Sequence, residues 1–349
     1  MLLTIISFLF VFTVITLVHE FGHLYFSKKA GIRVHEFGLG FGPTLFSFKK
    51  NNTTYKINLL PILGYVKIAG IDVEDPQEKE TPENEKYFNK SPFDKFKSIS
   101  SGAIMNLIFG FIIFSLVFMI SGSPVGISNE ISTITPGSPA AKIGMQAGDR
   151  LISINGKVYE DPQDAVKFIH KNYDKKITLK IKRSEKFLTL KAIPKYNKRL
   201  KIGLLGFSLK AVTEKVNPLQ AIWMGLKQTA SLILLILVLV GKLFSGRLAL
   251  GDLAGPVGIA QITGQFAHQG PISLLYFIAF FSVNVAVLNL LPIPALDGGR
   301  LVFVLIEAIR KKPINIESEN KVHSIGMILL LSLLAMLTFN DIFRIFFKN

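Results

Sequence analysis

Two histidines and a glutamate stand close together near the end of a long apolar stretch, in the order His19-Glu20-Phe21-Gly22-His23. On a helix, residues four positions apart lie on one face, so both imidazole rings would point the same way. Two imidazoles in this arrangement can share one Zn²⁺ ion, and a glutamate beside them can act as a general base toward water. The pattern predicts a hydrolytic metal site, with His19 and His23 as ligands and Glu20 as the base.

The stretch that carries this motif has the character of a membrane span. No charged residue occurs between Met1 and Val18, as is typical of a transmembrane helix. A cleaved signal peptide is the alternative, but no Lys or Arg precedes the apolar run and no small-residue cleavage pattern follows it. Lys28, Lys29 and Arg33 follow the run instead, which places the N-terminus outside the cytoplasm. Ionisable groups in a span are costly and usually functional, which argues against a chance match.

The composition favours a membrane protein with a polar insert. Of the 349 residues, 49% are hydrophobic, and the mean hydropathy is +0.42, which is too apolar for an ordinary soluble protein. The chain has no cysteine, so a metal ion must be bound by His and carboxylate groups. The net charge of +16 favours contact with the anionic headgroups of a lipid bilayer. We expect no nucleic acid partner, because there is no basic motif with interleaved aromatic residues.

Residues 31–70 are rich in β-forming residues and turn signals. Their alternating polar and apolar side chains predict short strands, and Lys50-Asn51-Asn52 predicts a hairpin turn. The glycines and the proline of residues 38–43 predict a further turn. We expect a small sheet that lies against the membrane beside the His pair, with an unpaired edge that could accept an extended substrate strand. The predicted strands are 34–38, 44–48, 54–58 and 65–68.

A polar cytoplasmic loop is predicted for residues 71–97, and a second span for residues 99–120. Gly102 and Asn106 fall on the early turns of this span. A polar amide in a span has two interpretations, which the sequence leaves open: an interhelical hydrogen bond, or support for a functional site.

Residues 123–209 form a separate polar domain. The segment contains Gly-Ser-Pro-Ala at 137–140, Ala-Gly-Asp-Arg at 147–150, and a strand that ends in an Asn-Gly turn at 155–156. The sequence also predicts a helix near 164–170 and later strands. The segment resembles the PDZ domains of bacterial proteases, which capture extended peptides by strand addition. A spacer or size filter without a ligand is the alternative.

A segment rich in helix-breaking residues ends the third predicted span. This span covers residues 272–291 and runs into Pro292 and Pro294, which must break or unwind the helix. Asp297 then presents a carboxylate on irregular backbone at membrane depth. The basic residues 310–312 mark a cytoplasmic loop, and the last span is predicted for residues 322–339.

The number of spans can be predicted if Asp297 and the His pair lie near the same side of the membrane, as a shared metal ion requires. The second span carries the chain outward, so the PDZ-like segment is extracytoplasmic. The span that ends near Asp297 must then travel inward, which works only if residues 219–244 make no net crossing. We therefore expect four transmembrane helices, with residues 219–244 embedded in the outer side of the membrane or lying on it.

Together these residues resemble the site-2 protease family of intramembrane zinc metalloproteases, and its bacterial RseP-like branch in particular. The resemblance rests on residues 19–23, on the β-rich region, on Gly102 and Asn106, on the single PDZ-like segment, and on Asn-Leu-Leu-Pro-Ile-Pro-Ala-Leu-Asp-Gly at 289–298. It implies a polytopic α-helical membrane protein with a membrane-associated β-hairpin sheet and an inserted α/β PDZ domain. It also implies the site residues: His19, His23 and Asp297 hold one Zn²⁺ ion, Glu20 activates water, and Asn289 and the segment Gly64, Tyr65, Val66, Lys67 and Ile68 bind the substrate.

The resemblance further implies an endopeptidase of the bacterial cytoplasmic (inner) membrane. Its substrates would be single-pass membrane proteins, either regulators such as anti-sigma factors or remnant signal peptides, after a first cleavage by an upstream site-1 protease. The PDZ domain would gate untrimmed substrates. Enterobacterial members of the branch have two tandem PDZ domains, whereas this chain has room for one.

The expected organisation has four parts. A first catalytic membrane half covers residues 1–121, a PDZ domain 122–210, a membrane-associated linker 211–270 and a second catalytic membrane half 271–349. A non-catalytic PDZ membrane scaffold is the alternative function, but the intact Glu20 argues against it. A metal transporter is a further alternative, but the sequence lacks the inverted internal repeat that is typical of many transporters.

Overall fold

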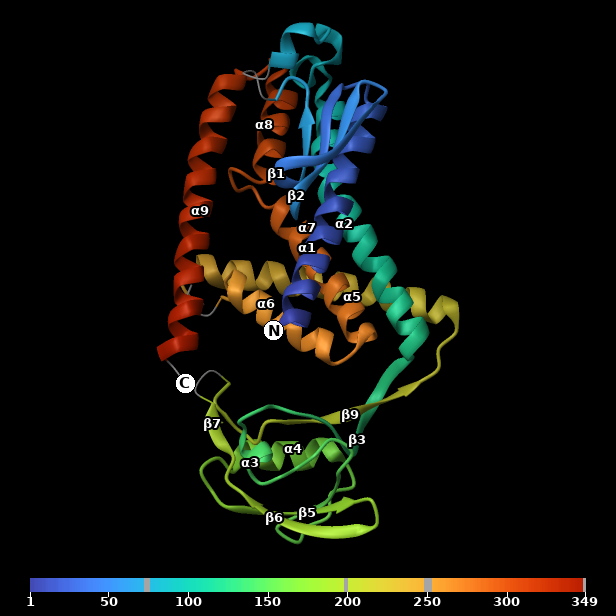
Figure 1. The fold of residues 1–349 in the computed structure, drawn as a ribbon, viewed down its shortest axis with the longest axis vertical. Coiled ribbons are helices and arrows are strands. Elements are labelled where there is room, and N and C mark those ends of the chain that lie inside the picture. The colour runs from blue at the N-terminus through green and yellow to red at the C-terminus, as the bar shows by residue number, and fades with distance from the viewer. Residues whose placement is uncertain (72–75, 198–199, 248–252, 348–349) are drawn as a thin grey trace. The chain divides into compact units, whose positions relative to one another are not determined.

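The computed structural model describes residues 1–71, 76–197, 200–247 and 253–347 (Figure 1). The chain divides into two compact units: a helical unit of Met1–Ile120 and Asn217–Asn349, and an inserted unit of Ser121–Val216. The loop predicted at 71–97 and the linker predicted at 211–270 each lie partly outside the described residues, at 72–75 and 248–252. We describe each unit by itself.

Within the described ranges, five helices of the helical unit are long and apolar enough to cross a membrane. They define a polytopic α-helical membrane protein and include helices at all the positions where spans are predicted. Two shorter helices, α6 (Pro256–His268) and α8 (Asp297–Arg310), complete the helical part. The five long helices are α1 (Leu2–Lys29), α2 (Pro92–Ser121), α5 (Pro218–Phe244), α7 (Pro271–Leu290) and α9 (Ile316–Phe347).

A two-stranded antiparallel sheet follows α1. Its strands, β1 (Val34–Lys50) and β2 (Thr53–Ile68), are joined at Asn51 and Asn52. Both asparagines have positive φ angles, 50° and 60°, which is the conformation of a tight hairpin turn. The predicted hairpin is therefore present at this position. Three short 3₁₀ turns, at Pro76–Glu80, Glu83–Glu85 and Tyr87–Asn89, lead from the sheet to α2.

β1 bends at its glycines instead of ending there. Gly40 and Gly42 have φ angles of 79° and 91°, and the pairing with β2 shifts register around them. The turn predicted for residues 38–43 is present as a reversal within β1, because Leu39 before it and Phe46 after it both pair with Ile57 of β2. As a result Leu39 is paired with both Gly64 and Ile57, and the start of β1 lies inside the sheet. Beyond the bend, apolar side chains are exposed at Phe41, Leu45, Phe46, Leu59, Leu60 and Leu63.

Small residues let the long helices approach one another closely. A Cβ atom added to Gly22 of α1 would lie 2.5 Å from the carbonyl oxygen of Ser101 of α2. A Cβ on Gly110 of α2 would lie 2.6 Å from Val283 of α7. Close backbone contact through small residues is typical of helix packing in membranes. The α1–α2 contact lies within the motif at 19–23, so the glycine of that motif has a packing role.

α5 runs crosswise to α1 and α9 (Figure 1). Gly225 of α5 lies against Ser115 of α2, and Leu232 and Ile236 of α5 share a buried cluster with Phe114 and other residues of α2 and α7. The rest of α5 exposes large apolar side chains, at Leu219, Ile222, Trp223, Leu226, Leu234, Leu235, Leu237 and Val238.

The inserted unit is a five-stranded sheet with two short helices. The sheet order is β6-β5-β4-β3-β9, and β7 and β8 form a separate pair. Its core contains Ile131, Ile154, Leu179 and Ile181, all at most 1% exposed. The elements are β3 (Ser123–Ile134), α3 (Pro139–Lys142), β4 (Arg150–Ile154), α4 (Pro162–Lys171), β5 (Ile177–Arg183), β6 (Lys186–Ala192), β7 (Lys195–Asn197), β8 (Ile202–Leu204) and β9 (Phe207–Glu214).

Asp149 is the buried charge of the inserted unit. Its carboxylate accepts hydrogen bonds from Nε and Nη2 of Arg183, at 2.7 and 2.9 Å, and from the backbone N–H of Gln146 at 2.8 Å. Burial by itself would raise the pKa of Asp149, but the hydrogen bonds from Arg183 and Gln146 outweigh it and hold that pKa below its usual range. The acidic residue of the Ala-Gly-Asp-Arg sequence thus ties β5 to the turn before β4.

Candidate active site

The start of α8 brings Asp297 to the two histidines of α1. The Nε2 atoms of His19 and His23 lie 3.2 Å apart, and Oδ2 of Asp297 lies 3.2 Å from the first and 3.4 Å from the second. A tetrahedral metal ion with bonds of about 2.0–2.1 Å separates its ligand atoms by roughly 3.3 Å. The three donor atoms therefore form a triangle of the size that one Zn²⁺ ion requires, and a fourth position remains for water or substrate.

The contacts of Asp297 are better explained by a shared ion than by hydrogen bonds. Among the described residues, Oδ2 of Asp297 has no partner with hydrogen-bond geometry, although both ring nitrogens are close to it. Three ligand atoms that converge on one point in this way form the arrangement that a metal ion satisfies. Two imidazoles and one carboxylate are also a ligand set found in hydrolytic zinc sites.

The backbone of α2 orients His23. Nδ1 of His23 lies 2.8 Å from the carbonyl oxygen of Ser98, so Nδ1 carries the proton and donates it. Nε2 is then unprotonated and free to bind a metal ion. Nδ1 of His19 is buried and has no such partner in the described part of the chain. The two histidines are therefore held by different means.

Gly102 of α2 leaves the space that the two rings occupy. A Cβ atom at this position would lie 2.8 Å from Cε1 and from Nε2 of His19, and it would also collide with Nε2 of His23. No side chain larger than hydrogen fits there without moving a ring. Gly102 thus lets α2 form a wall of the site, while Ser98, one turn earlier, holds His23.

The segment between α7 and α8 carries Asp297. Pro292 and Pro294 prevent α7 from continuing, and Ala295 turns the chain with a φ angle of 80°. Gly298 then lies against the last carbonyl groups of α7, and a Cβ on Gly299 would lie 2.5 Å from the carbonyl oxygen of Ile293. The two glycines following Asp297 therefore allow α8 to start directly against the end of α7, which brings Asp297 to the histidines.

The other predicted site residues fall into two groups. Gly64 of β2 lies beside the base, because a Cβ there would be 3.1 Å from Cγ of Glu20 and 3.3 Å from Cγ2 of Thr16. Val66 and Ile68, on the same side of the strand, pack into a buried cluster with Ile32.

Tyr65 and Lys67 alternate with these residues and approach Glu36, with Tyr65 Oη 3.2 Å from a carboxylate oxygen. Asn289 is half-buried in the last turn of α7. The structure therefore brings the backbone near Gly64 to Glu20, and it directs the side chains of Tyr65 and Lys67 elsewhere.

Asn106 is fully buried in α2, one turn beyond Gly102. Its backbone carbonyl accepts a hydrogen bond from Oγ of Ser282 in α7, at 2.8 Å. Neither atom of its side-chain amide has a hydrogen-bond partner among the described residues. The interhelical hydrogen bond considered for this amide is thus not among the contacts described.

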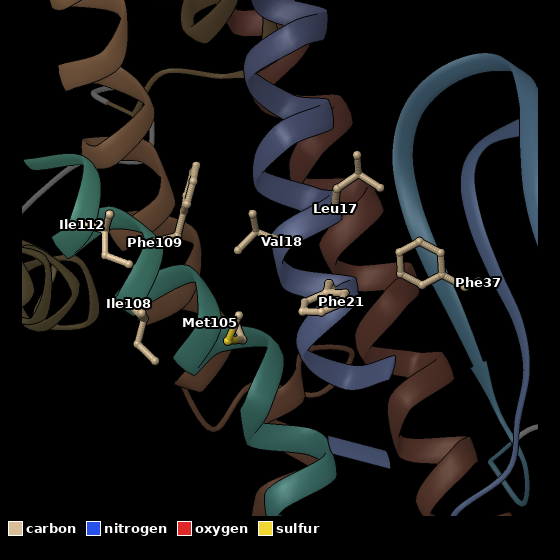
Figure 2. A pocket seen from close by; sticks show the side chains of 8 residues that line it. All are labelled: Leu17, Val18, Phe21, Phe37, Met105, Ile108, Phe109 and Ile112. Carbon is tan, nitrogen blue, oxygen red and sulfur yellow. The ribbon is translucent and has the colours of Figure 1, made fainter. Parts of the chain in front are cut away.

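A wholly apolar pocket of about 410 Å³ lies beside the site, between α1 and α2. Figure 2 shows side chains of α2 facing those of α1, with Phe37 contributed by β1. Leu17, Val18 and Phe21 of α1 line this pocket and flank His19 and Glu20 in the sequence. The remaining lining residues are Met105, Ile108, Phe109 and Ile112.

Comparison with known proteins identifies the class to which this fold and site belong. The model of peptidase family M50 matches residues 7–333. The regulator of sigma-W protease RasP of Bacillus subtilis is 35% identical, and the match covers 98% of this chain and 99% of that protein. The zinc metalloprotease RasP of Bacillus licheniformis is 34% identical, with the same coverage of both chains.

Part of the chain is also similar to the crystal structure of the PDZ domain of an SdrC-like protein from Listeria monocytogenes. The identity is 22%, the TM-score is 0.22, and the match covers 24% of this chain and 86% of that one.

The protein is an intramembrane protease of the site-2 type. The chain belongs to peptidase family M50, and the resemblance inferred from its motifs is confirmed. The sequence indicated no role for Ser98 and no packing role for Gly22, because both roles depend on the contact between α1 and α2.

Proposed function

We propose that this protein is a zinc-dependent endopeptidase that cleaves transmembrane segments of single-pass membrane proteins. The observation that carries the proposal is the triangle of His19, His23 and Asp297, with sides of 3.2–3.4 Å. It lies between helices of membrane-spanning length. The names of the Bacillus relatives, both proteases and one a zinc metalloprotease, support the choice of metal.

Glu20 acts as the general base of the proposed reaction. When bound, zinc supplies a Lewis acid that lowers the pKa of water and polarises the peptide carbonyl. Glu20 follows His19 directly and lies under β2 at Gly64, so its carboxylate is placed to take a proton from the attacking water. It then delivers that proton to the leaving amine.

β2 and Asn289 receive the substrate backbone. A transmembrane helix hides its carbonyl groups in internal hydrogen bonds, so the scissile segment must become extended before attack. The segment Gly64–Ile68 pairs with β1 along one edge, and no strand in the described ranges covers its other edge. Substrate backbone added at that edge passes Glu20, and the Asn289 amide holds a freed carbonyl or N–H group.

The apolar pocket between α1 and α2 accommodates apolar side chains of the substrate (Figure 2). Its lining includes Val18 and Phe21, which precede and follow the His19–Glu20 pair. A side chain from a membrane span loses no polar contact on entering such a pocket.

The substrates are membrane-bound regulators such as anti-sigma factors, or remnant signal peptides, left by a first cleavage. The name of the Bacillus subtilis relative, a regulator of sigma-W protease, supports a regulatory substrate. The inserted unit gates access for untrimmed chains, and a separate upstream protease makes the first cut.

The chain crosses a bacterial inner membrane four times, with α1, α2, α7 and α9 as spans. The basic residues Lys28 and Lys29 at the end of α1 and the basic cluster at 310–312 support a cytoplasmic position for both of these ends. α5 lies along the outer side without crossing, which its crosswise direction supports (Figure 1). The N-terminus and the inserted unit are then extracytoplasmic, and the exposed apolar residues of β1 and β2 dip into the membrane.

Cleavage by the Glu20→Gln variant tests the proposed reaction. Full-length wild type and variant are purified in detergent, their zinc content is measured, and a model transmembrane substrate is added. We expect the variant to keep its zinc and to lose cleavage by about 100-fold or more, because the base is gone while the ligands remain. Glu185→Gln is the matched control, since that side chain is 92% exposed in the inserted unit. Equal cleavage by Glu20→Gln and wild type would refute the assignment of the base. If neither protein cleaves although both hold zinc, the scaffold alternative is favoured.

Labelling of single cysteines tests the four-span topology, because the natural chain has none. Lys215→Cys and Ser245→Cys bracket α5. If α5 does not cross, a membrane-impermeant maleimide labels both from outside intact cells. Lys312→Cys is the control and should react only after permeabilisation. Labelling of only one of the two flanking positions from outside would show that α5 crosses.

A further inference from the structure

The last span, α9, touches the segment that carries Asp297. The backbone N–H of Ala295 donates a hydrogen bond to Nδ1 of His323, with the two nitrogens 3.0 Å apart. One turn further along α9, Gly326 lies so close to the preceding proline that a Cβ there would be 2.6 Å from the carbonyl carbon of Pro294. Two consecutive residues of the Asp297 segment are therefore held by two residues of one face of α9.

The hydrogen bond is made where the chain adopts an unfavourable backbone conformation. Ala295 has a φ angle of 80°, which L-residues other than Asn, Asp and Gly rarely adopt. Because Ala295 lies two residues before Asp297, its φ angle sets the direction in which the chain enters α8. A partner for its N–H group therefore helps to fix where the Asp297 carboxylate points.

A cavity of about 1,050 Å³ lies on the side of α9, and both Ala295 and His323 line it. The ion pair of Arg300 with Glu319, at 3.0 Å, also joins the first turn of α8 to α9. His323 is itself only 8% exposed, and its ring is 5.9 Å from that of Phe303 in α8. The imidazole is thus fixed in place at the edge of the cavity, where it contacts the backbone N–H of Ala295.

We propose that His323 is a positioning residue for Asp297. It accepts the Ala295 N–H at Nδ1, so its own proton is on Nε2, and it stabilises the left-handed turn that directs Asp297 to His19 and His23. The inference rests on the proposed role of Asp297 as a metal ligand. Metal sites tolerate ligand displacements of only about 0.2 Å, so loss of this support changes metal affinity before it changes the fold.

Three variants of the full-length protein in detergent test the inference. His323→Leu removes the acceptor and keeps an apolar side chain in the buried site. His323→Asn keeps an acceptor, because the amide oxygen of Asn lies where Nδ1 of His lies. Asn320→Leu is the matched control: Asn320 is one turn earlier on α9 and donates its hydrogen bond to the carbonyl of Ile71, at 3.1 Å, away from the Asp297 segment.

Zn²⁺ affinity is measured by competition with a chelating dye, and the visible spectrum of the Co²⁺-loaded protein reports ligand geometry. We expect His323→Leu to bind Zn²⁺ about 10–100-fold more weakly and to alter the Co²⁺ spectrum. His323→Asn and Asn320→Leu should both stay within about threefold of wild type. Wild-type affinity in His323→Leu, or an equal loss in Asn320→Leu, would overturn the inference.

Asp297→Ala separates this inference from the proposed function. If Asp297→Ala weakens Zn²⁺ binding and His323→Leu does not, the role of His323 is refuted and the ligand assignment stands. If Asp297→Ala binds Zn²⁺ as well as wild type, the ligand assignment fails, and the role of His323 fails with it.

Discussion

Adding one methyl group to Gly102 should abolish metal binding without unfolding the protein. In Gly102→Ala, the new Cβ would lie 2.8 Å from two ring atoms of His19 and would also overlap Nε2 of His23. Ordinary contact begins at 3.4 Å, so the His19 ring must retreat by about 0.6 Å, three times the displacement of about 0.2 Å that metal sites tolerate. We expect Zn²⁺ affinity to fall by about 100-fold or more.

The same substitution should leave the metal-free protein at least as stable as wild type. Alanine is favoured over glycine in a helix by about 0.5–1 kcal/mol, and without the ion the new methyl group displaces only the ends of two side chains and no backbone atom. The assay therefore compares two quantities: Zn²⁺ affinity by dye competition, and thermal unfolding of the metal-free protein in detergent. Gly241→Ala is the control, because a Cβ at this position of α5 meets nothing within 4 Å. Wild-type Zn²⁺ affinity in Gly102→Ala would refute the site geometry.

Three further results are expected. Lys95→Met should destabilise the helical unit by about 3–5 kcal/mol in thermal unfolding, because the 4% exposed side chain of Lys95 pairs with Glu307 at 2.8 Å. The double variant with Glu307→Leu should recover most of this loss, and a larger loss in the double variant than in the single one would contradict the argument. The inserted unit should lose protection from hydrogen exchange as the pH falls below about 4. The lowered pKa of Asp149 means that the folded unit binds fewer protons than the unfolded chain, so acid destabilises the folded unit. Asp149→Asn should be less stable than wild type at neutral pH, and its stability should change less with pH. An unchanged dependence of stability on pH in this variant would refute the argument. A strong chelator should stop cleavage and lower the unfolding temperature, Zn²⁺ should restore both, and cleavage that survives complete metal removal would exclude a metalloprotease.

Short-range features of the fold could be predicted from the sequence because they depend on local chemistry. The spacing of His19 and His23 places both rings on one helix face, and the asparagines 51–52 adopt the positive φ angles of a hairpin turn. The glycines of residues 38–43 reverse the chain within β1, as predicted. Their permissive φ angles do not reveal which segments pair on either side of the turn.

Long-range features of the site could not be derived from residue types alone. Asp297 was assigned by resemblance to a family motif, since nothing in its spacing brings it to residue 19. The closeness of Gly64 to Glu20 is likewise a tertiary contact. The hydrogen bond between Ala295 and His323 also joins two elements whose contact depends on the complete fold.

The partner that orients His23 is a backbone carbonyl, that of Ser98, and not a side chain. A backbone acceptor is retained whatever residue stands at position 98, so this half of the ligand pair is robust to mutation at its own contact. Drift in the sequence of α2 can remove it only by shifting the helix, which Gly22 and Gly102 prevent by holding the two backbones together. The tautomer of His23 therefore depends on how closely α1 and α2 pack. At this contact, activity depends on two glycines that carry no functional group.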